Sequence, residues 1–195
     1  MISVAVIRHG PTDWNEQKRI QGRADRTLSP AGRERVAGWK VPVEFDHFDW
    51  VVSPLVRAVE TAELLGLTCR TEPLLVEMNW GSWDGKTRDV LIENYGDEFE
   101  RRAARGLDFR PHGGESPREV RKRVRRWLDG VVERGQPTGA VCHQGVIRAL
   151  LSLATGWDMI AKPPHPLDWA AAHLFVAHED DRVEIDSLNV SLEGP

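Results

Sequence analysis

Short runs of apolar residues, each followed by polar residues, recur along the chain at intervals that leave room for helices. The run at residues 2–7 is rich in β-branched side chains and gives way to the sequence RHGP at 8–11, as expected for a buried strand that ends in a turn. Similar runs lie at residues 50–52, 68–71 and 138–142. We therefore predict a strand at each of these places.

Capping residues and apolar residues at helical spacing predict the helices between these strands. Ser29 followed by Pro30 is a helix-start signal, and the helix it opens extends through Lys40. The sequence SPRE at 116–119 combines an N-cap serine with a glutamate three residues later, a capping box, and predicts a helix to about Val132. Further helices are predicted at residues 55–65, 87–94, 97–105 and 146–154.

The C-terminal part of the chain has a different pattern. Two apolar runs between Ala170 and Ser191 flank the acidic sequence at 179–181 and predict a β-hairpin. Upstream, strands alternate with helices, which is typical of layered α/β folds with a largely parallel sheet. We expect a single domain that spans residues 1–195, because a chain of this length usually forms one core.

Charge and composition exclude several classes of function. The chain has 195 residues, and 30 acidic against 26 basic side chains give a formal net charge of −4. This mild acidity argues against nucleic acid or an anionic membrane surface as a partner, so any anionic ligand must be held locally. No apolar run is long enough to span a membrane or to form a signal-peptide core before Arg8. We expect a cytoplasmic protein.

Two other features are assigned structural roles. Cys69 and Cys142 are too few for a disulfide framework and lack the clustered spacing of a zinc site, so we interpret them as small core residues. The basic side chains of the helix at 116–132 could bind an anionic partner, but a solvated helix face is the more ordinary interpretation.

Polar residues follow three of the predicted strands at their carboxyl ends. Arg8 and His9 end the first strand, the segment 53–57 with Arg57 follows the second, and His143 ends a later one. Ligands of open α/β sheets bind beyond the carboxyl ends of the strands. Two arginines and two histidines brought together there would form a compact cationic pocket, and phosphate is its obvious occupant.

A histidine in such a pocket can also act as a nucleophile. A neutral imidazole nitrogen can attack phosphorus, and nearby arginines would lower the pKa of that histidine while they hold the phosphoryl oxygens. Hydrolysis also needs a proton donor for the leaving alkoxide. Glu77, within the sequence LVEMNWG at 75–81, is our candidate for this general acid.

These residues resemble the motifs of the histidine phosphatase superfamily, also called the phosphoglycerate mutase-like family. The sequence RHGPTDWN at 8–15 is similar to the RHG signature of that family. Further blocks follow in family order at 20–32, 53–62, 77–85, 113–116 and 141–145, so that the resemblance covers roughly residues 3–155. It implies a three-layer α/β/α fold with a mostly parallel central sheet, with no cofactor and no metal.

The resemblance also implies a role for each matching residue. His9 would be the phosphorylated nucleophile, and Glu77 would protonate the leaving group and then activate the attacking water. The phosphoryl group would be gripped by Arg8, Arg57 and His143, with Asn15 as a further contact.

Several residues keep two interpretations. Thr12 could donate a hydrogen bond from its hydroxyl to phosphate, or it could cap the turn. Glu115 could reach the pocket, or its segment could cap the helix that follows. Gln144 stands where many relatives have glycine and could bind substrate at the pocket rim. Trp80 and Trp83 could shape a surface for the leaving group or pack in the core.

Our leading hypothesis is a metal-independent phosphatase that hydrolyses a small phosphomonoester through phospho-His9. Within the phosphatases, the length and the Glu77 block are similar to the α-ribazole phosphatase branch. The runner-up is a cofactor-dependent phosphoglycerate mutase, which the short section of mixed charge at 93–102 disfavours. A non-catalytic module that binds a phosphate ligand is a third hypothesis. The edge of the C-terminal hairpin could pair in a homodimer.

Overall fold

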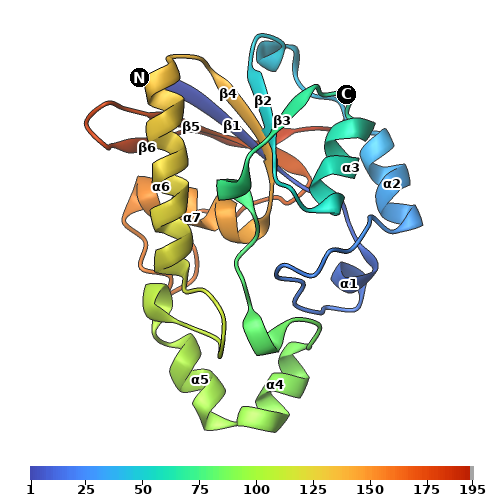
Figure 1. Cartoon of the computed structure of the whole chain (residues 1–195), viewed down its shortest axis with the longest axis vertical. Coiled ribbons are helices and arrows are strands. Elements are labelled where there is room, and N and C mark those ends of the chain that lie inside the picture. Colours follow the sequence, from blue (N-terminus) through green and yellow to red (C-terminus); the bar gives the residue numbers. More distant parts are fainter. Residues whose placement is uncertain (194–195) are drawn as a thin grey trace.

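A six-stranded sheet forms the centre of the computed structural model, which describes residues 1–193 (Figure 1). The order across the sheet is β3-β2-β4-β1-β5-β6. All four predicted strands and the predicted C-terminal hairpin are present. The strands are β1 (Ile2–Arg8), β2 (Asp49–Val52), β3 (Cys69–Thr71), β4 (Thr138–Cys142), β5 (Ala171–Ala177) and β6 (Val183–Ser191).

Most of the sheet is parallel, as the sequence predicts. Strands β3, β2, β4 and β1 pair with one another in parallel. The hairpin of β5 and β6 joins the sheet antiparallel to β1 and forms one of its edges. Every position of β4 is buried, as is typical of a parallel strand covered on both faces.

The helices begin at the capping residues that the sequence contains. Ser29 accepts a hydrogen bond from the backbone N–H of Gly32 at 3.0 Å, and Ser116 forms the predicted capping box. The helices are α1 (Asp13–Glu16), α2 (Pro30–Ala37), α3 (Val56–Leu64), α4 (Arg88–Tyr95), α5 (Asp97–Ala103), α6 (Pro117–Arg134) and α7 (Gln144–Thr155).

Three helical elements differ from the prediction, and one of them is α2, which ends at Ala37 rather than at Lys40. The short helix α1, which Thr12 caps, has no counterpart in the predicted set. Helix α7 begins at Gln144 rather than at Val146, because His143 takes the extended backbone conformation of an N-cap residue. Gln144 and the residue after it therefore lie in the first turn of a helix, not in a loop.

Alternating residues of β1 show how the sheet lies between two helical layers. Val4 and Val6 belong to the apolar cluster that also contains the buried stripe of α6 and much of α7. Ala5 belongs to the cluster on the opposite face, which includes residues of α2 and α3. Side chains alternate across a strand, so each face of the sheet packs on one pair of helices (Figure 1). The three-layer α/β/α fold is confirmed, and α4 and α5 project beyond the sheet as a separate arm.

The cysteines and the hydrophobic segments agree with this layout. Cys142 is buried in the core, whereas Cys69, on the short edge strand, is half-buried, and both are free thiols. Within residues 1–193, no helix combines the length and the apolar character that crossing a lipid bilayer requires.

Candidate active site

The adjacent strands β2, β4 and β1 bring their carboxyl ends to one place. Backbone hydrogen bonds continue from the strands into the following residues, from His9 N–H to the Cys142 carbonyl and from Ser53 N–H to the Val141 carbonyl, both at 3.0 Å. A cavity of about 710 Å³ lies at this edge. Six of the predicted site residues line it, namely Arg8, His9, Asn15, Arg57, Glu77 and Gln144.

His9 is held in one tautomer. Its Nδ1 lies 2.7 Å from the carbonyl oxygen of Gly10, which can only accept a hydrogen bond, so Nδ1 carries the proton and Nε2 carries the lone pair. The Nε–H of Arg57 donates to this Nε2 at 3.3 Å. Burial, and then the positive charges of Arg8 and Arg57, hold the pKa of His9 well below its ordinary value. His9 is therefore neutral, as a nucleophile at phosphorus must be.

Arg57 is completely buried, and backbone carbonyls fix its position. Its Nη1 donates to the carbonyl of Ala24 at 2.9 Å, and its Nη2 donates to the carbonyl of Gly22 at 2.8 Å. Gly22 has a φ of +48°, and a Cβ there would lie 2.0 Å from Oδ1 of Asp84, so only glycine fits this turn. The predicted motif at 20–25 thus acts by holding Arg57 against His9.

The guanidinium of Arg8 makes no hydrogen bond within residues 1–193 and rests on an aromatic ring instead. Its guanidinium carbon lies 5.3 Å from the centre of the Trp169 ring, and its buried Nε has no partner within residues 1–193. Burial lowers the pKa of Arg8 to about 10, and the positive charge of Arg57 also lowers it. At neutral pH the side chain keeps its charge, and its donors are available to a ligand in the cavity.

His143 lies beside His9 and is fully buried. The ring centres of the two histidines are 5.2 Å apart, and Nε2 of His143 lies 2.6 Å from the hydroxyl oxygen of Ser53. Its buried Nδ1 has no partner in the described part of the chain. His143 is not among the residues that line the cavity, although its ring lies next to that of His9, which does line it. Burial, with Arg57 next, holds its pKa well below the ordinary value.

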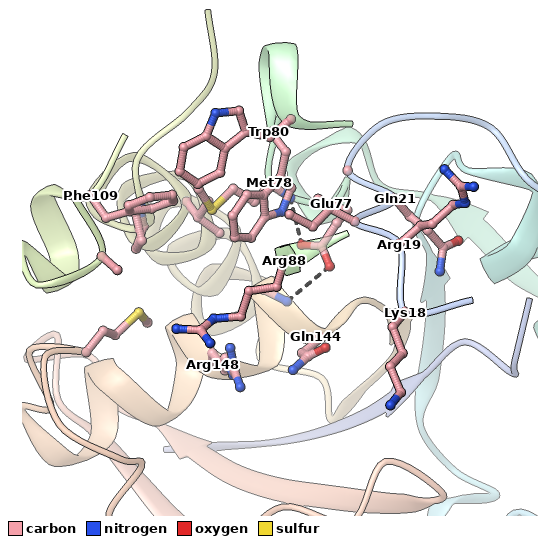
Figure 2. A pocket seen from close by; sticks show the side chains of 18 of the residues that line it. Lys18, Arg19, Gln21, Glu77, Met78, Trp80, Arg88, Phe109, Gln144 and Arg148 are labelled. Atoms are coloured by element: carbon pink, nitrogen blue, oxygen red, sulfur yellow. Dashed lines mark hydrogen bonds between the residues drawn. The ribbon is translucent and has the colours of Figure 1, made fainter. Parts of the chain in front are cut away.

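Glu77 is fixed by two backbone donors, one from the next residue and one from a distant part of the chain. Oε1 accepts the N–H of Met78 at 2.7 Å, and Oε2 accepts the N–H of Gly145 at 3.1 Å (Figure 2). Gly145 belongs to the first turn of α7, where backbone N–H groups have no partner inside the helix. The carboxyl group therefore stands at the cavity wall in a position where it can deliver a proton to a bound ester.

Asn15 and Thr12 form one unit. Oδ1 of Asn15 accepts the N–H of Thr12 at 3.0 Å and its hydroxyl at 3.1 Å. Asn15 lines the cavity, and with its oxygen engaged its amide nitrogen is left to donate to a ligand. Thr12 is buried and is not among the residues that line the cavity. It is the N-cap residue of α1, and its side chain accepts the backbone N–H of Asn15.

The remaining candidates divide between the cavity and the core. Trp80 and Trp83 both line the cavity, and Trp83 also packs in an aromatic cluster with its ring centre 5.3 Å from that of Phe99. Glu115 does not line the cavity, and it does not cap α6, whose capping box is formed by Ser116 and Glu119. Its carboxylate instead pairs with Nε of Arg123 at 2.9 Å.

The structure adds cavity residues that sequence reasoning missed. Arg148 lies four residues after Gln144 in α7, which places both on the same helix face, and both line the cavity. The helical spacing is a signal that could have found Arg148. Trp169, which contacts Arg8, lies in the irregular segment before β5, where the sequence offers no such signal.

Comparisons with known proteins match this chain over most of its length. The family model of the histidine phosphatase superfamily (branch 1) matches residues 4–191. Phosphoserine phosphatase 1 of Hydrogenobacter thermophilus is 30% identical over 166 residues, which cover 82% of this chain and 79% of that protein. The probable phosphoglycerate mutase GpmB of Proteus mirabilis is 31% identical over 176 residues, or 83% of this chain and 79% of that protein.

A solved structure shows the same architecture. The mycobacterial glucosyl-3-phosphoglycerate phosphatase, in a complex with VO3, superimposes with a TM-score of 0.81 at 27% sequence identity. The match covers 98% of this chain and 100% of that one. The fold is therefore shared over nearly the whole of both chains.

Proposed function

The chain belongs to the histidine phosphatase superfamily (branch 1), and from this premise we propose that it hydrolyses a small phosphomonoester through phosphorylation of His9, without a metal ion. The family resemblance predicted from the sequence is thereby confirmed. One observation carries the proposal: the neutral His9 holds its Nε2 lone pair beside Arg57, in a cavity that Arg8 also lines.

In the first half of the proposed reaction, the phosphoryl oxygens bind between Arg8, Arg57 and Asn15. The Nε–H of Arg57 leaves Nε2 of His9 and donates to a phosphoryl oxygen. The freed lone pair of Nε2 attacks phosphorus, a P–N bond forms, and the bond from phosphorus to the ester oxygen breaks. Glu77 gives its proton to that oxygen, so the leaving group departs as a neutral alcohol.

In the second half, water takes the place of the alcohol. The carboxylate of Glu77 accepts a proton from the water, and the oxygen of the water attacks phosphorus while the P–N bond breaks. The products are inorganic phosphate, neutral His9 and protonated Glu77, which is ready for the next cycle. The fixed positive charges of Arg8 and Arg57 stabilise the phosphoryl oxygens in both steps.

The relative named as a probable phosphoglycerate mutase supports a second candidate function. A mutase would return the phosphoryl group of phospho-His9 to another hydroxyl of the acceptor, whereas a phosphatase gives it to water. Incubation with 3-phosphoglycerate separates the two. Release of inorganic phosphate supports hydrolysis, and formation of an isomeric phosphoglycerate without free phosphate supports the mutase.

The test of the proposed function is to trap the intermediate. Brief exposure to a phosphomonoester, an alkaline quench and peptide mass spectrometry are expected to place phosphate on His9, with turnover that persists when a chelator is present. His9→Asn is expected to take up no phosphate, and its thermal unfolding checks that it folds. Phosphate on another residue, or turnover that the chelator abolishes, would contradict the proposal. A panel with α-ribazole phosphate, phosphoserine, sugar phosphates and nucleotides then identifies the substrate.

A further inference from the structure

The cavity carries more positive charge than one phosphoryl group neutralises. Among the described residues that line it there is one carboxylate, that of Glu77. Around it stand six basic side chains: Arg8, Lys18, Arg19, Arg57, Arg88 and Arg148. Arg8 and Arg57 belong to the phosphoryl site, which leaves four cations for another purpose.

Two of these four cations already have protein partners. Nη2 of Arg88 pairs with Oε1 of Glu100 at 2.8 Å. Arg19 donates to the side chain of Gln17 at 2.8 Å and to the carbonyl of Gly85 at 2.7 Å. Their charges or donors are thus satisfied before any substrate arrives.

Arg148 is the cation without a partner. Within residues 1–193 its guanidinium makes no hydrogen bond or ion pair, and its Nε is buried with no acceptor. It lies 5.9 Å from the centre of the Trp169 ring, which supports the guanidinium plane but supplies no negative charge. Leaving a buried donor without an acceptor is costly, and such groups are commonly satisfied by water or a ligand. Lys18 also faces the cavity, but it is exposed at the rim, where water solvates its charge.

Helix α7 places Arg148 on the cavity wall that also supplies a backbone donor to Glu77. Arg148 lies one helical turn after Gln144 and Gly145, and the N–H of Gly145 binds the carboxyl group of Glu77. Glu77 must contact the ester oxygen that it protonates. Figure 2 shows the side chains of Gln144 and Arg148 together on the wall of the cavity. A group attached to the departing alcohol would therefore come within reach of Arg148.

Charge balance indicates which group this is. In the proposed reaction, the dianionic phosphoryl group offsets Arg8 and Arg57, and Glu77 enters the first step with the proton that it donates. Arg148, which is partly buried and has no acceptor for its Nε within residues 1–193, remains. We propose that Arg148 binds a carboxylate on the leaving group, so that the substrates are phosphomonoesters of hydroxy acids. This inference rests on the proposed function and names its substrate class.

A matched pair of substrates tests the inference. 3-Phosphoglycerate and glycerol 3-phosphate share a three-carbon chain and differ in a carboxylate against a hydroxymethyl group. We expect the wild type to prefer the acid by about tenfold or more in kcat/KM, the usual range for one charged contact in a site. Arg148→Met is expected to bring this ratio close to unity, and Arg148→Lys is expected to retain part of it. Arg88→Met is the matched control, because Arg88 already forms an ion pair with Glu100. This variant should keep the preference of the wild type for 3-phosphoglycerate.

The outcomes separate this inference from the proposed function. Turnover of an aryl phosphate, which has no carboxylate, reports on the phosphatase alone. An enzyme that hydrolyses the aryl phosphate but does not prefer 3-phosphoglycerate overturns the carboxylate site and leaves the phosphatase standing. A preference that survives in Arg148→Met overturns it equally. An enzyme that hydrolyses none of the three and forms no phospho-His9 overturns the proposed function, and this inference with it.

Discussion

Glu77 and Gly145 fit against each other so closely that a side chain at position 145 would displace the carboxyl group of Glu77. The N–H of Gly145 donates to Oε2 of Glu77 at 3.1 Å, and a Cβ on Gly145 would lie 2.3 Å from Oε1. Gly145 therefore positions Glu77 in two ways. Its N–H donates a hydrogen bond to the carboxyl group, and its lack of a side chain leaves room for that group. The position of Glu77 is set by a helix that begins far away in the sequence.

Gly145→Ala is expected to displace the carboxyl group of Glu77 and so to lower kcat. A misplacement of about 1 Å in a catalytic group can cost on the order of 100-fold, and we expect a loss of that order with alkyl phosphates. Gly130→Ala, in the middle of α6, is the matched control, because a Cβ there meets only the flexible end of Arg134, at 3.3 Å. Steady-state kinetics and thermal unfolding of both variants check the expectation. Full activity in Gly145→Ala would show that the contact does not position the acid.

Glu77→Gln tests the proton transfer itself. An aryl oxide is a good leaving group and needs little protonation, whereas an alkoxide needs a full proton. We therefore expect kcat to fall by about 100-fold to 10,000-fold with an alkyl phosphate, and by much less with an aryl phosphate. The ratio of the two losses is the measurement. Equal losses on both substrates would remove Glu77 from the role of general acid.

The elements that the sequence predicts well are those with local signals. The helix after Ser116 is recognisable because its cap and its buried stripe lie within the same few turns. The start of α7 is harder to predict, because His143 caps it through its backbone conformation and its side chain makes no capping hydrogen bond. Sequence rules recognise an N-cap by serine, threonine, aspartate or asparagine, so they do not identify His143 as one.

The site shows the same division. His9, Arg8 and Arg57 stand at strand ends or early in a helix, where topology alone brings them together. The contact between the Trp169 ring and the guanidinium of Arg8 is different, because Trp169 lies in a segment whose apolar residues follow no helical or strand spacing. This contact forms only when the chain folds. The missing partner of Arg148 is likewise a property of the packed structure. Sequence motifs predict the reacting groups, whereas their supports and the charge balance of the cavity require coordinates.

Three buried histidines make the stability depend on pH. Burial holds the pKa values of His9 and His143 well below the ordinary value, and it lowers that of His173 to about 4. In the unfolded chain these groups titrate near their ordinary pKa of about 6.5, so below that pH the unfolded state binds protons that the folded state does not. The free energy of unfolding is therefore highest above this pH and falls as the pH falls, by about 1.4 kcal/mol per pH unit for each histidine.

Urea unfolding between about pH 7.5 and pH 5 measures this slope, since the carboxylates with lowered pKa values titrate below that window. His173→Gln removes one titrating group that lies away from the cavity, and we expect the slope to fall by roughly one third. A stability that stays constant across the window would mean that the folded protein protonates these histidines. An unchanged slope in His173→Gln would remove that residue from the set.

Trp169 stands between two arginines and is expected to position both. The guanidinium carbons of Arg8 and Arg148 lie 5.3 and 5.9 Å from its ring centre, and neither arginine has an acceptor for its Nε within residues 1–193. Because the ring is the contact that holds Arg8 in place, Trp169→Leu is expected to raise the inhibition constant of inorganic phosphate by about tenfold, in line with a desolvated cation–π contact. Trp169→Phe keeps an aromatic face and should restore most of the affinity. A role limited to packing would instead lower the thermal midpoint and leave phosphate inhibition unchanged in the folded variant, and that result would exclude Trp169 as a positioning residue.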